Sequence, residues 1–66
     1  MIESLRKKHG FSQIELARKV GVTQQAISAY EKGIRQPPID VLIKLSEIFN
    51  CTIDELVKGE KENGIN

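Results

Sequence analysis

The sequence predicts an all-α fold, a compact domain of five short helices, and two observations support this prediction. The chain has 66 residues and only three aromatic side chains, two Phe and one Tyr, so its single small core must be mainly aliphatic. Helix-capping and helix-stopping residues also divide the chain into short segments with tight connections. We therefore expect one domain over residues 1–59 and a polar, frayed tail over residues 60–66.

The first two helices are predicted from a glycine stop and a capping box. Residues 2–8 form the first helix, which ends before Gly10. Ser12 and Glu15 then have the S-x-x-E spacing of a capping box, in which each side chain bonds the backbone N–H of the other residue. This spacing predicts a second helix over residues 13–20.

The third helix follows the second after a very short turn. Thr23 can cap a helix over residues 24–32, and Gly33 ends it. Only Gly21 and Val22 separate the second helix from this cap. So short a connection makes the two helices meet at a steep angle, which is the helix-turn-helix arrangement.

Two more helices are predicted in the second half of the chain. Pro37 and Pro38 forbid helix before them and pre-set φ for a fourth helix over residues 39–49. Thr52 and Glu55 repeat the capping-box spacing, which predicts a short fifth helix that a glycine ends.

The fourth helix is unusually apolar. Ile39 and Ile43 widen its apolar surface beyond the core stripe of the helix. Two interpretations stay open: the extra surface serves a homodimer, or the helix is buried on all sides. The stripe itself consists of Val41, Leu42, Leu45, Ile48 and Phe49.

The net charge of +1 is unevenly divided along the chain. Residues 1–36 hold seven bases against three acids, and residues 37–66 hold three bases against six acids. The first part would attract phosphate and the second would repel it. An ordinary surface of mixed charge explains the same counts, so charge alone decides nothing.

The third helix has two distinct faces when its residues are placed about 100° apart. Ala26, Ile27 and Tyr30 form an apolar arc for the core. The opposite arc carries short or hydrogen-bonding side chains, namely Gln24, Gln25, Ser28, Ala29 and Lys32. Any surface helix has a polar face, but one selected only for stability would carry Glu and Lys pairs there.

This polar arc suits the reading of DNA bases. A Gln amide offers a donor and an acceptor together and can pair with adenine, a Ser hydroxyl bonds either way, and Ala can contact a thymine methyl group. The predicted base-contacting residues are Gln24, Gln25, Ser28 and Ala29. Glu31 lies beside the apolar arc instead, and we expect it to form a structural ion pair with Arg6.

Residues 10–33, GFSQIELARKVGVTQQAISAYEKG, resemble the Cro/repressor-type (XRE-like) helix-turn-helix domains, which include the lambdoid phage repressors. The resemblance covers the S-Q-x-E-L-A start of the second helix, the G-V-T turn, the E-K-G end of the third helix, and the later P-x-I-D-V-L-I-K-L pattern. It implies a lambda-repressor-like fold and a sequence-specific, DNA-binding regulator of transcription that acts as a repressor.

The resemblance also implies roles for individual residues. Gln24 and Gln25 match glutamines that contact base edges in some phage repressors, and Arg6 and Glu31 match a structural pair. Ser28 and Ala29 align with further contact positions, but their identities differ from those repressors, so the operator cannot be transferred. The DNA backbone contacts that it implies are Gln13, Thr23, Lys32 and Arg35.

One position departs from the family pattern. Pro38 stands where many relatives have a Ser or Thr helix cap and where some phage repressors have a basic residue for the minor groove. Reading of the minor groove by this position is therefore lost.

Other classes of function find little support in the sequence. Cys51 and His9 are the only residues of their types, so we expect no disulfide, no metal site, no cofactor and no enzymatic activity. No apolar run approaches the roughly 18 residues of a membrane span, and we expect a cytoplasmic protein without a membrane partner. The expected partners are double-stranded DNA, with a palindromic operator, and a second copy of the chain. The alternative is a protein-interaction module of the same fold, either a bridging coactivator or an antitoxin.

Overall fold

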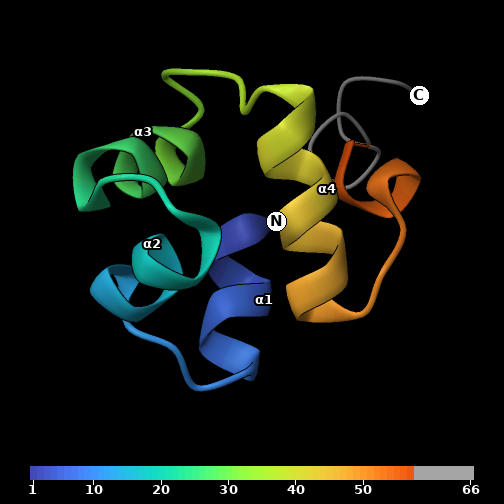
Figure 1. The fold of residues 1–66 in the computed structure, drawn as a ribbon, viewed down its shortest axis with the longest axis horizontal. Coiled ribbons are helices and arrows are strands. Elements are labelled where there is room, and N and C mark those ends of the chain that lie inside the picture. Colours follow the sequence, from blue (N-terminus) through green and yellow to red (C-terminus); the bar gives the residue numbers. More distant parts are fainter. Residues whose placement is uncertain (58–66) are drawn as a thin grey trace.

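The computed structural model describes residues 1–57, and these residues form helices without any strand. The predicted five-helix, all-α fold is confirmed (Figure 1). The predicted tail and the glycine stop at Gly59 lie outside the described residues. The helices are α1 (Ile2–Lys8), α2 (Gln13–Val20), α3 (Gln24–Lys32), α4 (Ile39–Phe49) and a last helical turn over residues 53–57.

Both predicted capping boxes are present. At the start of α2, the Glu15 backbone N–H donates to Ser12 Oγ at 3.0 Å, and the Ser12 N–H donates to Glu15 Oε1 at 2.8 Å. Thr52 and Glu55 exchange the same two bonds, at 2.9 and 3.0 Å, before the last helical turn. Each box satisfies two N–H groups that a helix start would otherwise leave unpaired.

The turn between α2 and α3 is closed by a left-handed glycine. Gly21 has a φ of 85°, a conformation that a glycine adopts without steric cost. The N–H groups of Gly21 and Val22 both donate to the Ala17 carbonyl, at 2.8 and 3.0 Å. Thr23 Oγ1 then accepts the N–H of Ala26 at 3.1 Å, so α3 begins directly after the turn. Figure 1 shows α2 and α3 packed against each other beside α1.

The core lies between the helices and is aliphatic except for Tyr30 and Phe49, as the composition predicts. Its members are Ile2, Leu16, Ala17, Val20, Ala26, Ile27, Tyr30, Val41, Leu45, Phe49 and Leu56.

The α4 helix is not buried on all sides within this chain. Its core residues include Leu45, which is fully buried, and Leu42 packs at the edge of the core. Ile39 and Ile43 remain 63% and 44% exposed. The structure therefore excludes the interpretation that α4 is buried on all sides within this chain. An apolar surface beyond the core is present.

His9 lies against aromatic rings, and Cys51 packs against the hydrophobic core. The His9 ring stacks on Phe11, with ring centroids 6.2 Å apart, and lies 5.3 Å from the ring of Phe49. Cys51 packs against the core, where burial, and to a smaller extent the charge of Glu55, raises the pKa of its thiol. Within residues 1–57 no three His, Cys, Asp or Glu side chains are grouped so as to hold a metal ion, and no helix has the length and apolar character to cross a membrane.

Candidate nucleic-acid interface

The α3 helix presents the two faces that its sequence predicts. Ala26, Ile27 and Tyr30 are buried and fix the helix to the core. Gln24 and Gln25 are exposed, so the first turn of α3 offers two amides to a partner. Ser28, Ala29 and Lys32 continue this face, with the first two half-buried and the lysine exposed.

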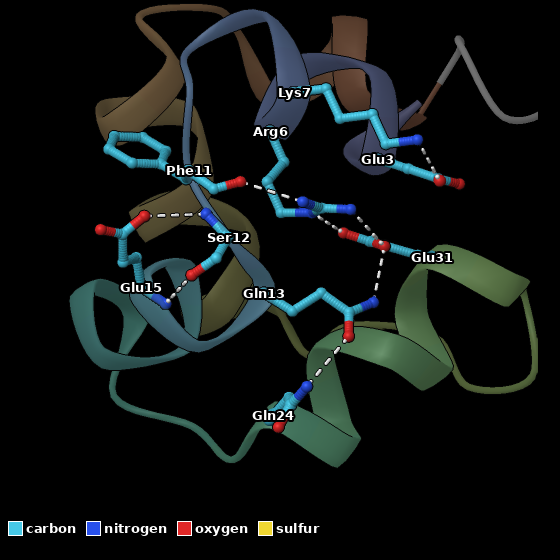
Figure 2. A network of polar contacts seen from close by, with 9 residues as sticks. All are labelled: Glu3, Arg6, Lys7, Phe11, Ser12, Gln13, Glu15, Gln24 and Glu31. Atoms are coloured by element: carbon cyan, nitrogen blue, oxygen red, sulfur yellow. Dashed lines mark hydrogen bonds and ion pairs between the residues drawn. The ribbon is translucent and has the colours of Figure 1, made fainter.

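Two predicted site residues from different helices are joined by a hydrogen bond. Gln24 Nε2 donates to Gln13 Oε1 at 3.3 Å, and Gln13 Nε2 donates to Glu31 Oε1 at 3.0 Å (Figure 2). The Gln13 side chain thus connects the first residue of α2 with both ends of α3. It lies next to Gln24, one of the predicted base-contacting residues, as well as at the start of a helix.

A buried ion pair anchors this network. Arg6 Nε donates to Glu31 Oε2 at 2.6 Å, and its Nη2 donates to Glu31 Oε1 at 3.3 Å, so the contact is bidentate. A third N–H, on Nη1, reaches the Phe11 carbonyl at 2.9 Å. The two side chains are only 11% and 4% exposed. The pair that the sequence predicts between Arg6 and Glu31 is therefore present, and it joins α1 to α3.

The ion pair also sets the electrostatics beside α3. The hydrogen bond to Glu31 raises the pKa of Arg6, although burial of the guanidinium opposes this rise. Arg6 therefore stays charged and compensates the carboxylate of Glu31. An uncompensated negative charge at this position would repel a phosphate backbone.

The Gln24 amide keeps the bonding groups that a base would need. An amide nitrogen has two N–H groups, and one of them is used on Gln13. Among the described residues, no bond is made by its second N–H or by its carbonyl oxygen. A donor and an acceptor side by side are the pair that matches the major-groove edge of adenine.

The remaining predicted contact residues lie at the two ends of α3. Thr23 is exposed and uses its oxygen to cap the helix, which leaves the hydroxyl hydrogen for an acceptor outside the chain. Lys32 lies in the last turn, and Arg35 lies in the loop after Gly33, both exposed. Seven of the eight predicted contact residues are on or beside α3. The eighth, Gln13, is in α2 and reaches α3 through its amide.

The role of Gln13 as a link inside the protein is not predicted from the sequence. Its two partners are 11 and 18 positions away in the chain, so no local pattern indicates these bonds. Only the predicted crossing of α2 and α3 could have suggested that their side chains meet.

A family model described as "Helix-turn-helix" matches residues 2–56 of the chain. The chain belongs to the helix-turn-helix family. This membership confirms the resemblance to Cro/repressor-type domains that residues 10–33 carry.

Several members of the helix-turn-helix family are similar over most of the chain. YqaE of Bacillus subtilis, an uncharacterized HTH-type transcriptional regulator, is 36% identical over 64 residues, which are 97% of this chain and 55% of YqaE. YgzD of the same organism is 34% identical over 94% of either chain. The chain spans about half the length of YqaE and only 16% of a putative regulatory protein of Pyrococcus furiosus.

One solved structure is also similar. It is the N-terminal DNA-binding domain of SinR from Bacillus subtilis, with a TM-score of 0.77 and 33% sequence identity. The match covers 85% of this chain and 83% of the SinR domain.

Proposed function

We propose that the chain is a sequence-specific, DNA-binding transcriptional regulator, and a repressor, whose α3 helix lies in the major groove. The observation that carries this proposal is the exposed amide face at the start of α3, fixed from behind by buried Ile27 and Tyr30. The names of the relatives and the similarity to the SinR domain support the same function. The role as a repressor rests on the resemblance to phage repressors.

Specificity would come from the side chains at the start and middle of α3. Gln24 has a free N–H and a free carbonyl within the described part of the chain, so it can bond N7 and N6 of one adenine. Gln25 and Ser28 lie on the same face for neighbouring bases. A good bidentate contact of this kind discriminates against the wrong base by about 1–3 kcal/mol.

Affinity would come mainly from contacts to phosphates. Lys32 and Arg35 supply positive charge at one end of α3, and Thr23 supplies a hydroxyl at the other. Gln13 donates one N–H to Glu31 and has a second for a phosphate. Such contacts fix the register of the protein on DNA without reading its sequence.

A homodimer on a palindromic operator completes the proposal. One module of this size reads only a few base pairs, and paired recognition helices lie about 34 Å apart, one turn of DNA. The exposed Ile39 and Ile43 give α4 an apolar surface that a second copy could cover.

The test is selection of bound duplexes from a random DNA pool, followed by titration of the selected duplex at several salt concentrations. We expect a palindromic consensus, with log affinity falling linearly with log salt. Replacing both Gln24 and Gln25 by Ala should abolish specific binding and leave the helical content unchanged. Glu47→Gln is the matched control, because Glu47 is exposed in the last turn of α4, the end that lies away from α3 (Figure 1).

Two results would contradict the proposal. Normal binding by the double Gln variant would refute the assignment of the base readers. A wild-type chain that enriches no duplex would favour the protein-interaction module, a bridging coactivator or an antitoxin, for which the acidic second half would supply the surface.

A further inference from the structure

The loop after α3 is held against the helix by its backbone. Gly33 adopts a left-handed conformation with a φ of 74° and turns the chain back. The N–H groups of Ile34 and Arg35 then both donate to the Ala29 carbonyl, at 2.9 and 3.4 Å. The backbone of Arg35 is therefore fixed relative to the last turn of α3.

The side chain of Arg35 is held by a second contact. Its guanidinium carbon lies 5.9 Å from the centroid of the Tyr30 ring, within the range of a cation–π interaction. Tyr30 is only 4% exposed and belongs to the core, so its ring is a rigid support. The guanidinium of an exposed residue is thus oriented by a buried one.

This contact leaves the guanidinium free to bind an anion. A guanidinium stacks through its flat face, and its N–H groups point outward from its edge. Within residues 1–57, the guanidinium of Arg35 has no hydrogen-bond or ion-pair partner. Arg6 is the opposite case, because three of its N–H groups are used on Glu31 and Phe11.

We propose that Tyr30 is a positioning residue for DNA binding, whose ring holds the Arg35 guanidinium at the C-terminal end of α3 for a bond to a backbone phosphate. This inference rests on the proposed function. A side chain that is ordered before binding loses less conformational freedom when it meets its partner. Tyr30 thus contributes to affinity through Arg35 without touching DNA.

The experiment is a double-mutant cycle of Kd on the selected duplex, with Tyr30→Leu, Arg35→Ala and the double variant. We expect Tyr30→Leu to raise Kd about twofold to fivefold in the wild-type background, which is the size of an exposed cation–π contact. It should leave Kd unchanged in the Arg35→Ala background, because there is no guanidinium to position. Tyr30→Phe keeps the ring and should bind as the wild type does.

The salt dependence gives a readout that a purely structural role would not change. Arg35→Ala should lower the slope of log Kd against log salt by about 0.9, the loss of one phosphate contact. A Tyr30→Leu variant that weakens binding equally in both backgrounds would overturn the inference, since Tyr30 would then act only through the core. Unchanged Kd and slope for Arg35→Ala would also overturn the inference. Specific binding of the selected duplex by the wild-type chain would still support the proposed function.

A further variant keeps the inference testable if Tyr30→Leu does not fold. Arg35→Lys retains the charge and leaves the core untouched, but it loses the planar group that can stack and donate together. We expect a twofold to fivefold rise in Kd for this variant as well, roughly the value of the stacked contact. A Kd equal to that of the wild type would show that the ring does not position the charge.

Discussion

At the scale of single residues, Glu31 is the feature that most needs explanation. It is the one acidic side chain of α3, it is almost fully buried, and it lies beside the face that we propose meets DNA. The bidentate bond from Arg6 and the amide bond from Gln13 satisfy both of its oxygens. The same carboxylate thereby connects α1 and α2 with α3.

Replacing Arg6 by Met should destabilise the domain strongly. The change leaves the Glu31 carboxylate buried without its counter-charge, a defect that costs about 3–5 kcal/mol in other buried pairs. Urea denaturation at neutral pH would measure the free energy of unfolding. The double variant Arg6→Met/Glu31→Leu should recover a large part of the loss, because it removes both charges. A loss below about 1 kcal/mol for Arg6→Met would show that the pair behaves like an exposed surface pair.

At the scale of the helices, the elements could be predicted because their signals are local. The capping box of Ser12 and Glu15 and the cap at Thr23 each act over three positions of the chain. Left-handed glycines such as Gly33 end helices for an equally local reason, the absence of a Cβ.

Tertiary contacts of the site could not be predicted in the same way. The helical period placed Glu31 beside the core, and the family resemblance supported Arg6 as its partner. Neither indicated the bond from Gln13, which lies 18 positions away. The period also left open whether Ile39 and Ile43 meet other helices. Their exposure depends on where neighbouring elements lie, and a single helix carries no information on that.

The turn between α2 and α3 gives a prediction at this scale. Gly21→Ala should lower the free energy of unfolding by about 1–2 kcal/mol, because its φ of 85° is left-handed. The added methyl group itself has room, since its nearest neighbour would be Lys44 Nζ at 3.8 Å. Thermal and urea unfolding would measure the loss. Ser4→Ala, at an exposed position of α1, is the control and should be neutral or slightly stabilising. An equally neutral Gly21→Ala would contradict the assigned backbone strain.

At the scale of the whole molecule, the proposed DNA-binding surface and the proposed dimer surface are on two different helices, α3 and α4. The polar face of α3 and the basic residues near it form the proposed DNA surface, and the apolar residues Ile39 and Ile43 lie at the start of α4. A dimer through Ile39 and Ile43 would therefore bury residues other than those of the polar face of α3.

Replacing Ile39 and Ile43 by Ser tests the proposed dimer. Both side chains are exposed, so the variant should fold with little loss of stability. We expect unchanged affinity for a single half-site and roughly 100-fold weaker binding to the palindromic duplex, because the gain from two linked contacts is lost. Analytical ultracentrifugation and duplex titration would measure both effects. Glu47→Ser, at another exposed position of α4, is the control. A variant that still prefers the palindrome would place the interface elsewhere.

The bond between Gln13 and Gln24 has a consequence for redesign of operator preference. Position 24 is tied to α2 and through it to the ion pair, so a new side chain there would have to replace a bond inside the protein. Gln25 and Ser28 form no side-chain hydrogen bond within the described part of the chain. New specificities are therefore accessible by substitutions of Gln25 and Ser28, which leave the bonds inside the protein unchanged. Substitutions of Gln24 should be combined with substitutions of Gln13.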